Sequence, residues 1–349
     1  MLQLQATVLL LMSIAALVAS QSLPNLVDAL VASGASQFAD FIQSDPEVLQ
    51  LYLSEQVKTV FAPSDSGLGN ETLKERDLSA SARREAAFQS ARGTTSLESA
   101  SRSLPGATLE TNNQAPLLDG RGQRVVIDTR PLNVTSPSKR WISHSTLRRQ
   151  VNETAPSLLR ISSGLGKTTN VIKADIPYDG GIIHITDSYF TIPESLSSTS
   201  QATGQTAFAG LLSRSNSTST LDGTHSVTVF LPSDAAFSAT NSTIPASQLV
   251  SDHVVAGTVS YLPDLKDGSV LTTQCGETLA ISIRGGRYYV NGGLITQANL
   301  VLENGVAHVV NKVLKPTPAS PPTGAASSNS MGFTGLFGLA CVIAMIALV

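Results

Sequence analysis

Cysteine is almost missing from this chain of 349 residues, because Cys275 and Cys341 are the only two. Two thiols cannot build the dense disulfide framework of small secreted domains, so stability has to come from packing. The apolar fraction of 42% is enough for buried cores, and the length corresponds to about two domains. We interpret Cys275 as a small buried hydrophobic residue, with an intermolecular disulfide as the alternative.

The chain also has no excess of positive charge and few long apolar runs. Its net charge is −3, which gives no electrostatic reason to expect a nucleic acid partner. The run Val8–Val18 is followed by small residues and predicts a signal peptide over residues 1–20, with a buried first helix as the alternative.

A second apolar run, residues 335–349, ends the chain. It is 15 residues long, whereas a membrane-spanning helix needs about 20. A Ser/Pro-rich stalk, residues 317–334, precedes it, and this order is typical of a glycosylphosphatidylinositol (GPI) anchor signal. A transmembrane helix is the alternative interpretation. The candidate attachment residues are Gly324, Ser327, Ser328 and Asn329.

Five N-x-Ser/Thr sequons lie between the two ends. Together with a signal peptide they predict a glycoprotein that passes through the secretory pathway. The sequons begin at Asn70, Asn133, Asn152, Asn216 and Asn241.

A pair of short motifs occurs twice along the chain. The first, Thr59 to Asp65, is an apolar strand-like run ended by proline and then Ser-Asp, and Thr228 to Asp234 repeats it. The second is a β-rich run with a histidine three residues after a turn glycine, at Gly181 to Asp187 and again at Gly305 to Asn311. This repetition predicts a duplicated module.

The two copies differ in length. The interval from Val60 to Gly181 is 45 positions longer than that from Val229 to Gly305. We place the extra residues in a loop insertion within Ser66–Arg160, which is polar and in places basic. The expected domains are therefore residues 23–194 and 207–316, joined by a linker over 195–206. A hairpin is expected across Gly285-Gly286.

The paired motifs resemble the two signature boxes of fasciclin-type FAS1 domains. The resemblance covers about Leu23–Pro193 and Gly204–Pro316. It implies an α+β fold of two FAS1 modules, each a wedge of two short β-sheets flanked by helices. Members are mostly extracellular adhesion or matrix-contact proteins, many with GPI anchors, and fungal members are common. The segment around His253 is similar to the family's central Tyr-His segment, with Asp252 in place of tyrosine, and the first module has no obvious counterpart.

No catalytic or metal-binding pattern emerges from the sequence. The chain has no G-x-S-x-G or H-E-x-x-H motif, and its five histidines are scattered. Gly164-Leu165-Gly166-Lys167-Thr168 lacks the earlier glycine of a phosphate loop and is interpreted as an ordinary loop. No metal or cofactor is expected. Structural roles are expected for the remaining motif residues, which are His184, His253, His308, Asp65 and Asp234.

Asp175 and Ile176 form the candidate adhesion site. An Asp-Ile pair occupies this place in some animal FAS1 proteins, where it is implicated in integrin contact. An exposed aspartate can bind a receptor-held cation while the apolar neighbour anchors the contact. The alternative is a turn or helix cap next to a core isoleucine. Leu302-Glu303 is near the equivalent place in the second module.

The sequence thus predicts a cell-surface adhesion protein without enzymatic activity. Its expected partners are cell-surface or matrix proteins or wall polysaccharide, with a lipid anchor to the plasma membrane or cell wall. A membrane-tethered factor of the vacuole or endomembrane system, acting in membrane traffic, is the first alternative. An enzyme acting on wall polysaccharide is the second, because folding can bring any two carboxylates together.

Overall fold

The computed structural model describes residues 22–67, 80–97, 106–128, 159–240 and 244–318. The expected signal peptide, attachment residues and apolar tail lie outside these ranges, as does most of the stalk. Among the described residues no helix is long and apolar enough to cross a membrane.

Three short helices open the described chain. They have clear local causes: Asn25 caps the first, Gly34 ends it in the left-handed conformation at φ 88°, and Asp45 caps the third. Their apolar faces pack together around Phe38 and Ile42, which are fully buried. The helices are α2 (Leu26–Ser33), α3 (Ser36–Ser44) and α4 (Pro46–Leu53).

The first sheet closes on itself in the order β1 to β7. The two sequence motifs become β1 and β7, which pair in parallel so that Phe61 lies opposite His184. Both strands are largely buried, which explains their continuous apolar character. The strands are β1 (Thr59–Pro63), β2 (Ser90–Ala91), β3 (Ala107–Gln114), β4 (Gly122–Asp128), β5 (Arg160–Ser162), β6 (Thr168–Tyr178) and β7 (Gly181–Thr186).

The interval Ser66–Arg160, within which the loop insertion was placed, contains regular structure in its described parts. They hold helix α5 (Ala80–Phe88), strands β2, β3 and β4, and the short helix η2 (Pro116–Leu118). Strand β3 is rich in Thr and Asn, and these side chains are buried because they find partners. The Thr111 hydroxyl donates to the carbonyl of Gln123, and the Asn112 amide donates to the Ser90 hydroxyl. The rest of the interval lies outside the described residues.

The structure does not agree with the linker expected over residues 195–206. Residues Leu196–Ala202 form helix α8, capped by Ser195, and Leu196 is buried in the apolar cluster of the following half. The helices that follow are α9 (Thr206–Arg214), α10 (Thr218–Asp222), α11 (Asp234–Ser238), α12 (Ala246–Ser251) and the short η3 (Leu262–Asp264). We call α2 to β7 the first half and α8 to β14 the second half.

The second sheet repeats the strand order of the first. Its order β10-β11-β12-β13-β14-β8-β9 matches β3-β4-β5-β6-β7-β1-β2, and β8 pairs with β14 in parallel as β1 does with β7. The expected hairpin across Gly285-Gly286 is confirmed as β11 and β12. The strands are β8 (Val227–Pro232), β9 (Val254–Val255), β10 (Val270–Thr272), β11 (Thr278–Arg284), β12 (Arg287–Val290), β13 (Gly293–Leu302) and β14 (Gly305–Val310).

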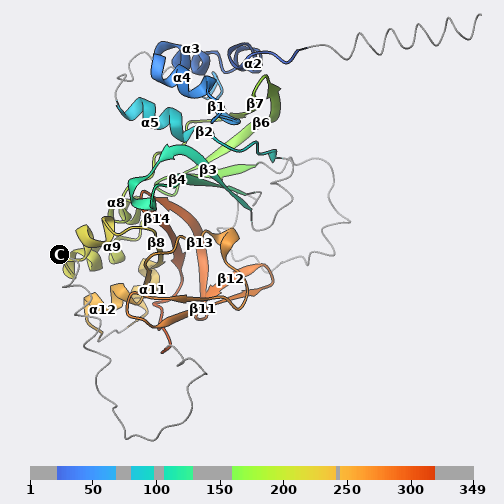
Figure 1. Cartoon of the computed structure of the whole chain (residues 1–349). Helices are drawn as coiled ribbons and strands as arrows, with labels where there is room; N and C mark the ends of the chain where they lie inside the picture. The colour runs from blue at the N-terminus through green and yellow to red at the C-terminus, as the bar shows by residue number, and fades with distance from the viewer. Residues whose placement is uncertain (1–21, 68–79, 98–105, 129–158, 241–243, 319–349) are drawn as a thin grey trace, which may run out of the picture.

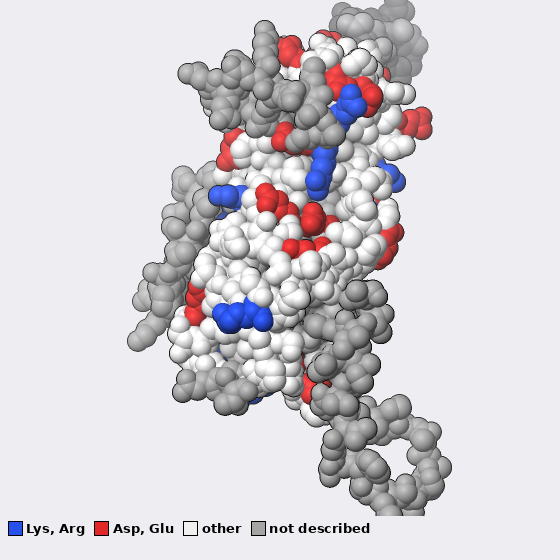
Figure 2. Space-filling view, turned by 90° about the vertical axis from the view of Figure 1, so that its left-hand side faces the viewer, with Lys and Arg blue, Asp and Glu red and all other residues white. Residues whose placement is uncertain are grey.

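The predicted α+β class is confirmed, with seven strands and flanking helices in each half. Figure 1 shows the halves stacked, the first in blue to green above the second in yellow to red, with β3 and β4 reaching toward β13 and β14. Charged side chains are sparse and of both signs on the face shown in Figure 2, and no broad basic area is visible there.

Candidate functional site

His184 connects several segments of the first half from within its core. Its ring is fully buried and lies 5.2 Å from the ring of Phe61. Nδ1 accepts the backbone N–H of Asp175 at 3.1 Å, so the ring proton is on Nε2, which donates to the carbonyl of Thr95 at 3.0 Å. Burial lowers the pKa of His184 to about 4. The imidazole is therefore neutral near pH 7 and links β7, β6 and the 93–97 loop.

His308 repeats this arrangement in the second half. Its Nδ1 accepts the N–H of Asn299 at 3.4 Å and its Nε2 lies 3.0 Å from the carbonyl of Ser260. The ring stacks on Phe230 at 5.7 Å. In each half, then, one buried histidine satisfies two backbone groups of neighbouring segments.

The candidate adhesion residue Asp175 lies inside β6, not in a turn before β7 as its position in the sequence had indicated. It sits at an irregularity of the β6–β7 pairing, with a left-handed φ of 56°. Its carboxylate accepts from the N–H of Leu97 at 3.0 Å and from the hydroxyl of Ser96 at 3.2 Å. Ile176 is half-buried against the apolar cluster of α2 to α4.

Asn299, and not Leu302-Glu303, is the equivalent of Asp175 in the second half. It has the same left-handed backbone, with φ 60°, and its side-chain oxygen accepts the N–H of Leu262 at 2.8 Å. Each residue also offers its own N–H to a histidine nine positions later. Asp175 therefore has a structural role in the bulge, and its side chain is 30% exposed.

Asp65 and Asp234 both cap a distant helix. Asp65 accepts from the N–H groups of Ser36 and Gln37 at the start of α3, and Asp234 accepts from the N–H of Ala207 at the start of α9. Hydrogen bonds hold the pKa of Asp234 below its usual range, with the Thr206 hydroxyl as the main donor. Each cap connects the end of the first box to the start of a helix.

His253 has a counterpart in the first half that the sequence did not reveal. His253 Nε2 accepts the N–H of Leu314 at 2.8 Å, and Nδ1 donates to the carbonyl of Leu249 at 2.7 Å. Gln89 occupies the equivalent place and accepts the N–H of Phe190 at 3.0 Å. The backbone carbonyls of His253 and Gln89 accept from Phe230 and Phe61 in turn.

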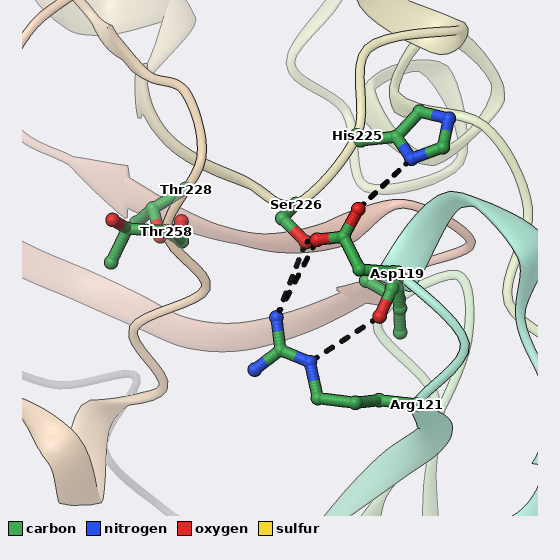
Figure 3. A network of polar contacts seen from close by, with 7 residues as sticks. Asp119, Arg121, His225, Ser226, Thr228 and Thr258 are labelled. Carbon is green, nitrogen blue, oxygen red and sulfur yellow. Dashed lines mark hydrogen bonds and ion pairs between the residues drawn. The ribbon is translucent and has the colours of Figure 1, made fainter.

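Asp119, His225 and Ser226 are the residue types of a hydrolytic triad, and they meet where the halves touch (Figure 3). The Asp119 carboxylate lies 3.1 Å from His225 Nδ1 and accepts from Ser226 Oγ at 2.6 Å. In a triad the serine donates to the imidazole, whereas here it donates to the carboxylate and is 1% exposed. These hydrogen bonds hold the pKa of Asp119 below its usual range, and the bond from Ser226 has the largest effect. Ser226 is therefore bonded to the carboxylate and not to the imidazole that would activate it in a triad.

Metal ligands are not grouped either. Across the described ranges, no three His, Cys, Asp or Glu side chains are placed to hold an ion. The Gly164 to Lys167 segment, which superficially looks like a phosphate loop, is the turn between β5 and β6 and packs against the second half.

Two expectations concern the surface. Asn216 is exposed at the end of α9, an accessible place for a glycan, and the other four sequons lie outside the described residues.

Cys275 was expected to be a buried hydrophobic residue, which is wrong. It is half-buried in the turn between β10 and β11 and is disulfide-bonded. Cys341, the only other cysteine of the sequence, lies outside the described residues.

One known domain family matches part of the chain. Residues 203–316 match the Fasciclin domain. These residues contain α9 to β14, with the second copy of both sequence motifs, His253 and His308. The match therefore covers the second half from α9 onward.

The relatives are fasciclin-like proteins. A fasciclin-like arabinogalactan protein of Arthroderma benhamiae is 33% identical over 48% of this chain and 43% of its own length. One of Cercospora beticola is 39% identical over 45% of this chain and 44% of its own. The chain thus spans less than half of either protein. The solved FAS1 domain pair of insect Fasciclin I aligns with 80% of this chain and 97% of its own, at 16% identity and a TM-score of 0.35.

Proposed function

We propose that this protein is a cell-surface contact protein with two fasciclin modules, and that it is not an enzyme. The observation that carries the proposal is the fasciclin domain match over residues 203–316, within a chain whose two halves have one strand order. The fasciclin-like arabinogalactan relatives support a place at the cell surface or wall.

The first half supports this as a second module because its polar contacts repeat those of the second. The Thr59 hydroxyl donates to the carbonyl of Gly93 and accepts the N–H of Thr95. The Thr228 hydroxyl does the same with the carbonyl of Thr258 and the N–H of Ser260. Together with the histidine, bulge and helix-cap contacts, these bonds hold a loop against the central parallel strands in both halves.

The same contacts explain why binding, and not catalysis, is proposed. His184 and His253 are buried and spend both ring nitrogens on backbone groups. The Ser226 hydroxyl, which lies near His225 and Asp119, donates to the carboxylate of Asp119 and not to the imidazole. These polar residues therefore stabilise the fold, and contacts with a partner would be made by the surface. Two modules on one tether gain avidity when both engage a partner.

The GPI anchor is part of the proposal and can be tested by the release of the protein from cells. Phosphatidylinositol-specific phospholipase C should release the protein from intact cells, and deletion of residues 335–349 should send it into the medium. A phospholipase-resistant protein would favour the membrane-spanning alternative, and absence of surface labelling would favour the vacuolar one.

The adhesion site is tested by Asp175→Asn. Asn299 makes the same bulge with an amide, so this change should keep the contacts with Leu97 and His184 while removing the charge. If the carboxylate binds a partner, attachment of protein-coated beads to cells or wall polysaccharide should fall about tenfold or more, as for a loss of about 2 kcal/mol at a hot spot. The melting temperature should stay within about 2 °C.

The matched control is Asn299→Asp, which adds a carboxylate to the other bulge. It should leave attachment unchanged, because Asn299 is buried. Undiminished attachment by a stably folded Asp175→Asn protein would remove Asp175 from the binding surface while leaving the adhesion proposal itself to the wild-type measurement.

A further inference from the structure

The two halves meet over a small closed apolar core. Val126 of β4 in the first half clusters with Tyr261, Val301 and Val306 of the second half, and all four are at most 1% exposed. Beside this cluster the Gln123 side chain donates to the carbonyl of Leu302 at 2.6 Å. Burial of this degree is typical of the interior of a domain, and flexibly joined domains have wetter, more polar contacts.

The turn between β5 and β6 fits into the junction. Gly164 forms a parallel bridge with Val301 and donates its N–H to Thr191. A Cβ at Gly164 would lie 2.3 Å from the carbonyl oxygen of Ile192, on the segment that leads into the second half. A Cβ at Gly166 would meet Thr203 and Leu300 at 2.7 and 3.0 Å. Only glycine lets this turn approach so closely.

A further group of polar contacts joins the two halves (Figure 3). Ser226 donates its N–H to the carbonyl of Leu117 at 3.0 Å and its hydroxyl to Asp119. The Arg121 guanidinium donates to the Ser226 hydroxyl at 3.3 Å. The turn after η2 is thereby tied to the start of β8.

Three of the seven non-glycine residues that have a left-handed backbone in the described part of the chain lie at these contacts. Asp119, Leu165 and Ser226 have φ values of 55°, 53° and 52°, in the left-handed region that side chains disfavour. Such conformations persist where the surroundings fix them. All three residues lie in segments where one half contacts the other. We attribute their backbone conformation to the contact between the halves.

We infer that the two halves are one cooperative unit with a fixed relative orientation, not independent modules on a flexible linker. This goes beyond the proposed function and does not depend on it. The consequence for binding is that the surfaces of both halves are presented as one rigid face.

The test uses the full chain and hydrogen exchange at two buried strands. In the wild-type protein, amides of β1 and β8 should exchange with protection factors equal within about threefold, because both open only by global unfolding. Gly164→Ala should break the coupling and separate the two by about tenfold or more. Gly93→Ala is the matched control, since a Cβ there meets nothing within 4 Å, and it should leave them equal.

A milder variant covers the case in which Gly164→Ala does not fold. Asp119→Gly removes the contacts with Ser226 and Arg121 but keeps a residue suited to the left-handed turn. It should also separate the protection of β1 and β8, by a smaller factor. Wild-type strands that already differ by more than about tenfold, or an Asp119→Gly protein as coupled as wild type, would overturn the inference.

Discussion

Replacing His253 by alanine is expected to destabilise the protein by about 2–5 kcal/mol, as a buried cavity and two unsatisfied backbone groups would be left behind. The groups are the N–H of Leu314 and the carbonyl of Leu249, both held by the ring. The N–H belongs to the segment after β14, so its release also loosens the end of the second half. Urea unfolding of the full chain measures the loss.

His253→Gln is the informative partner of this variant. Gln89 accepts the N–H of Phe190 at the equivalent place, so a glutamine can satisfy a group of this kind. We expect His253→Gln to recover at least about half of the stability lost in His253→Ala. If the two variants were equally unstable, ring packing and not the hydrogen bond to Leu314 would explain the effect.

The sequence predicted those parts of the fold that are coded locally. Thr59 to Asp65 is an apolar run ended by a proline, and the structure makes it a buried strand followed by a helix-capping aspartate. The structural use of His184 was also predictable, because a histidine in such a strand has few partners other than backbone. These features depend on residues that are neighbours in sequence or repeat between the halves.

The missed parts depend on partners far away in the chain. Strand β3 was not predicted, because Asn and Thr are not typical of a buried strand, and only the bonds to Ser90 and Gln123 explain their burial. Gln89 was missed because an amide and an imidazole look unrelated until both are seen to accept a backbone N–H. One overlooked signal existed, since Asp175 and Asn299 both precede a motif histidine by nine residues.

Asp252→Asn is expected to stabilise the protein at pH 7 by about 2–3 kcal/mol, from a pKa shift of about two units. Asp252 is 3% exposed, and its Oδ1 has no hydrogen-bond partner among the described residues. The equivalent place in the first half, before Gln89, holds the buried Phe88. Burial, with the charge of Glu277 as a second cause, raises the pKa of Asp252 to about 6.

The sign of the pH dependence follows from this direction. A carboxyl whose pKa is raised on folding from 3.8 to about 6 favours the folded state below its unfolded pKa, and that advantage is lost as the pH rises through 6. The neighbouring His253 acts oppositely. Burial lowers its pKa to about 4, so its contribution is present above 6.5 and is lost as the pH falls toward 4. In the wild-type protein the two effects offset each other between about pH 4 and 6.5.

Asp252→Asn removes the Asp252 contribution and leaves that of His253. Its advantage should be full at pH 7, shrink between pH 6 and 4, and vanish near pH 4, where wild-type Asp252 is protonated in the folded protein. The variant should therefore lose more stability on acidification than the wild type does, because the His253 effect is left unopposed. Urea unfolding at pH 7, 5.5 and 4.5 measures this, with Glu277→Gln expected to give a smaller gain in the same direction. A gain that is equal at all three pH values would show that packing, and not the charge of Asp252, separates the two proteins.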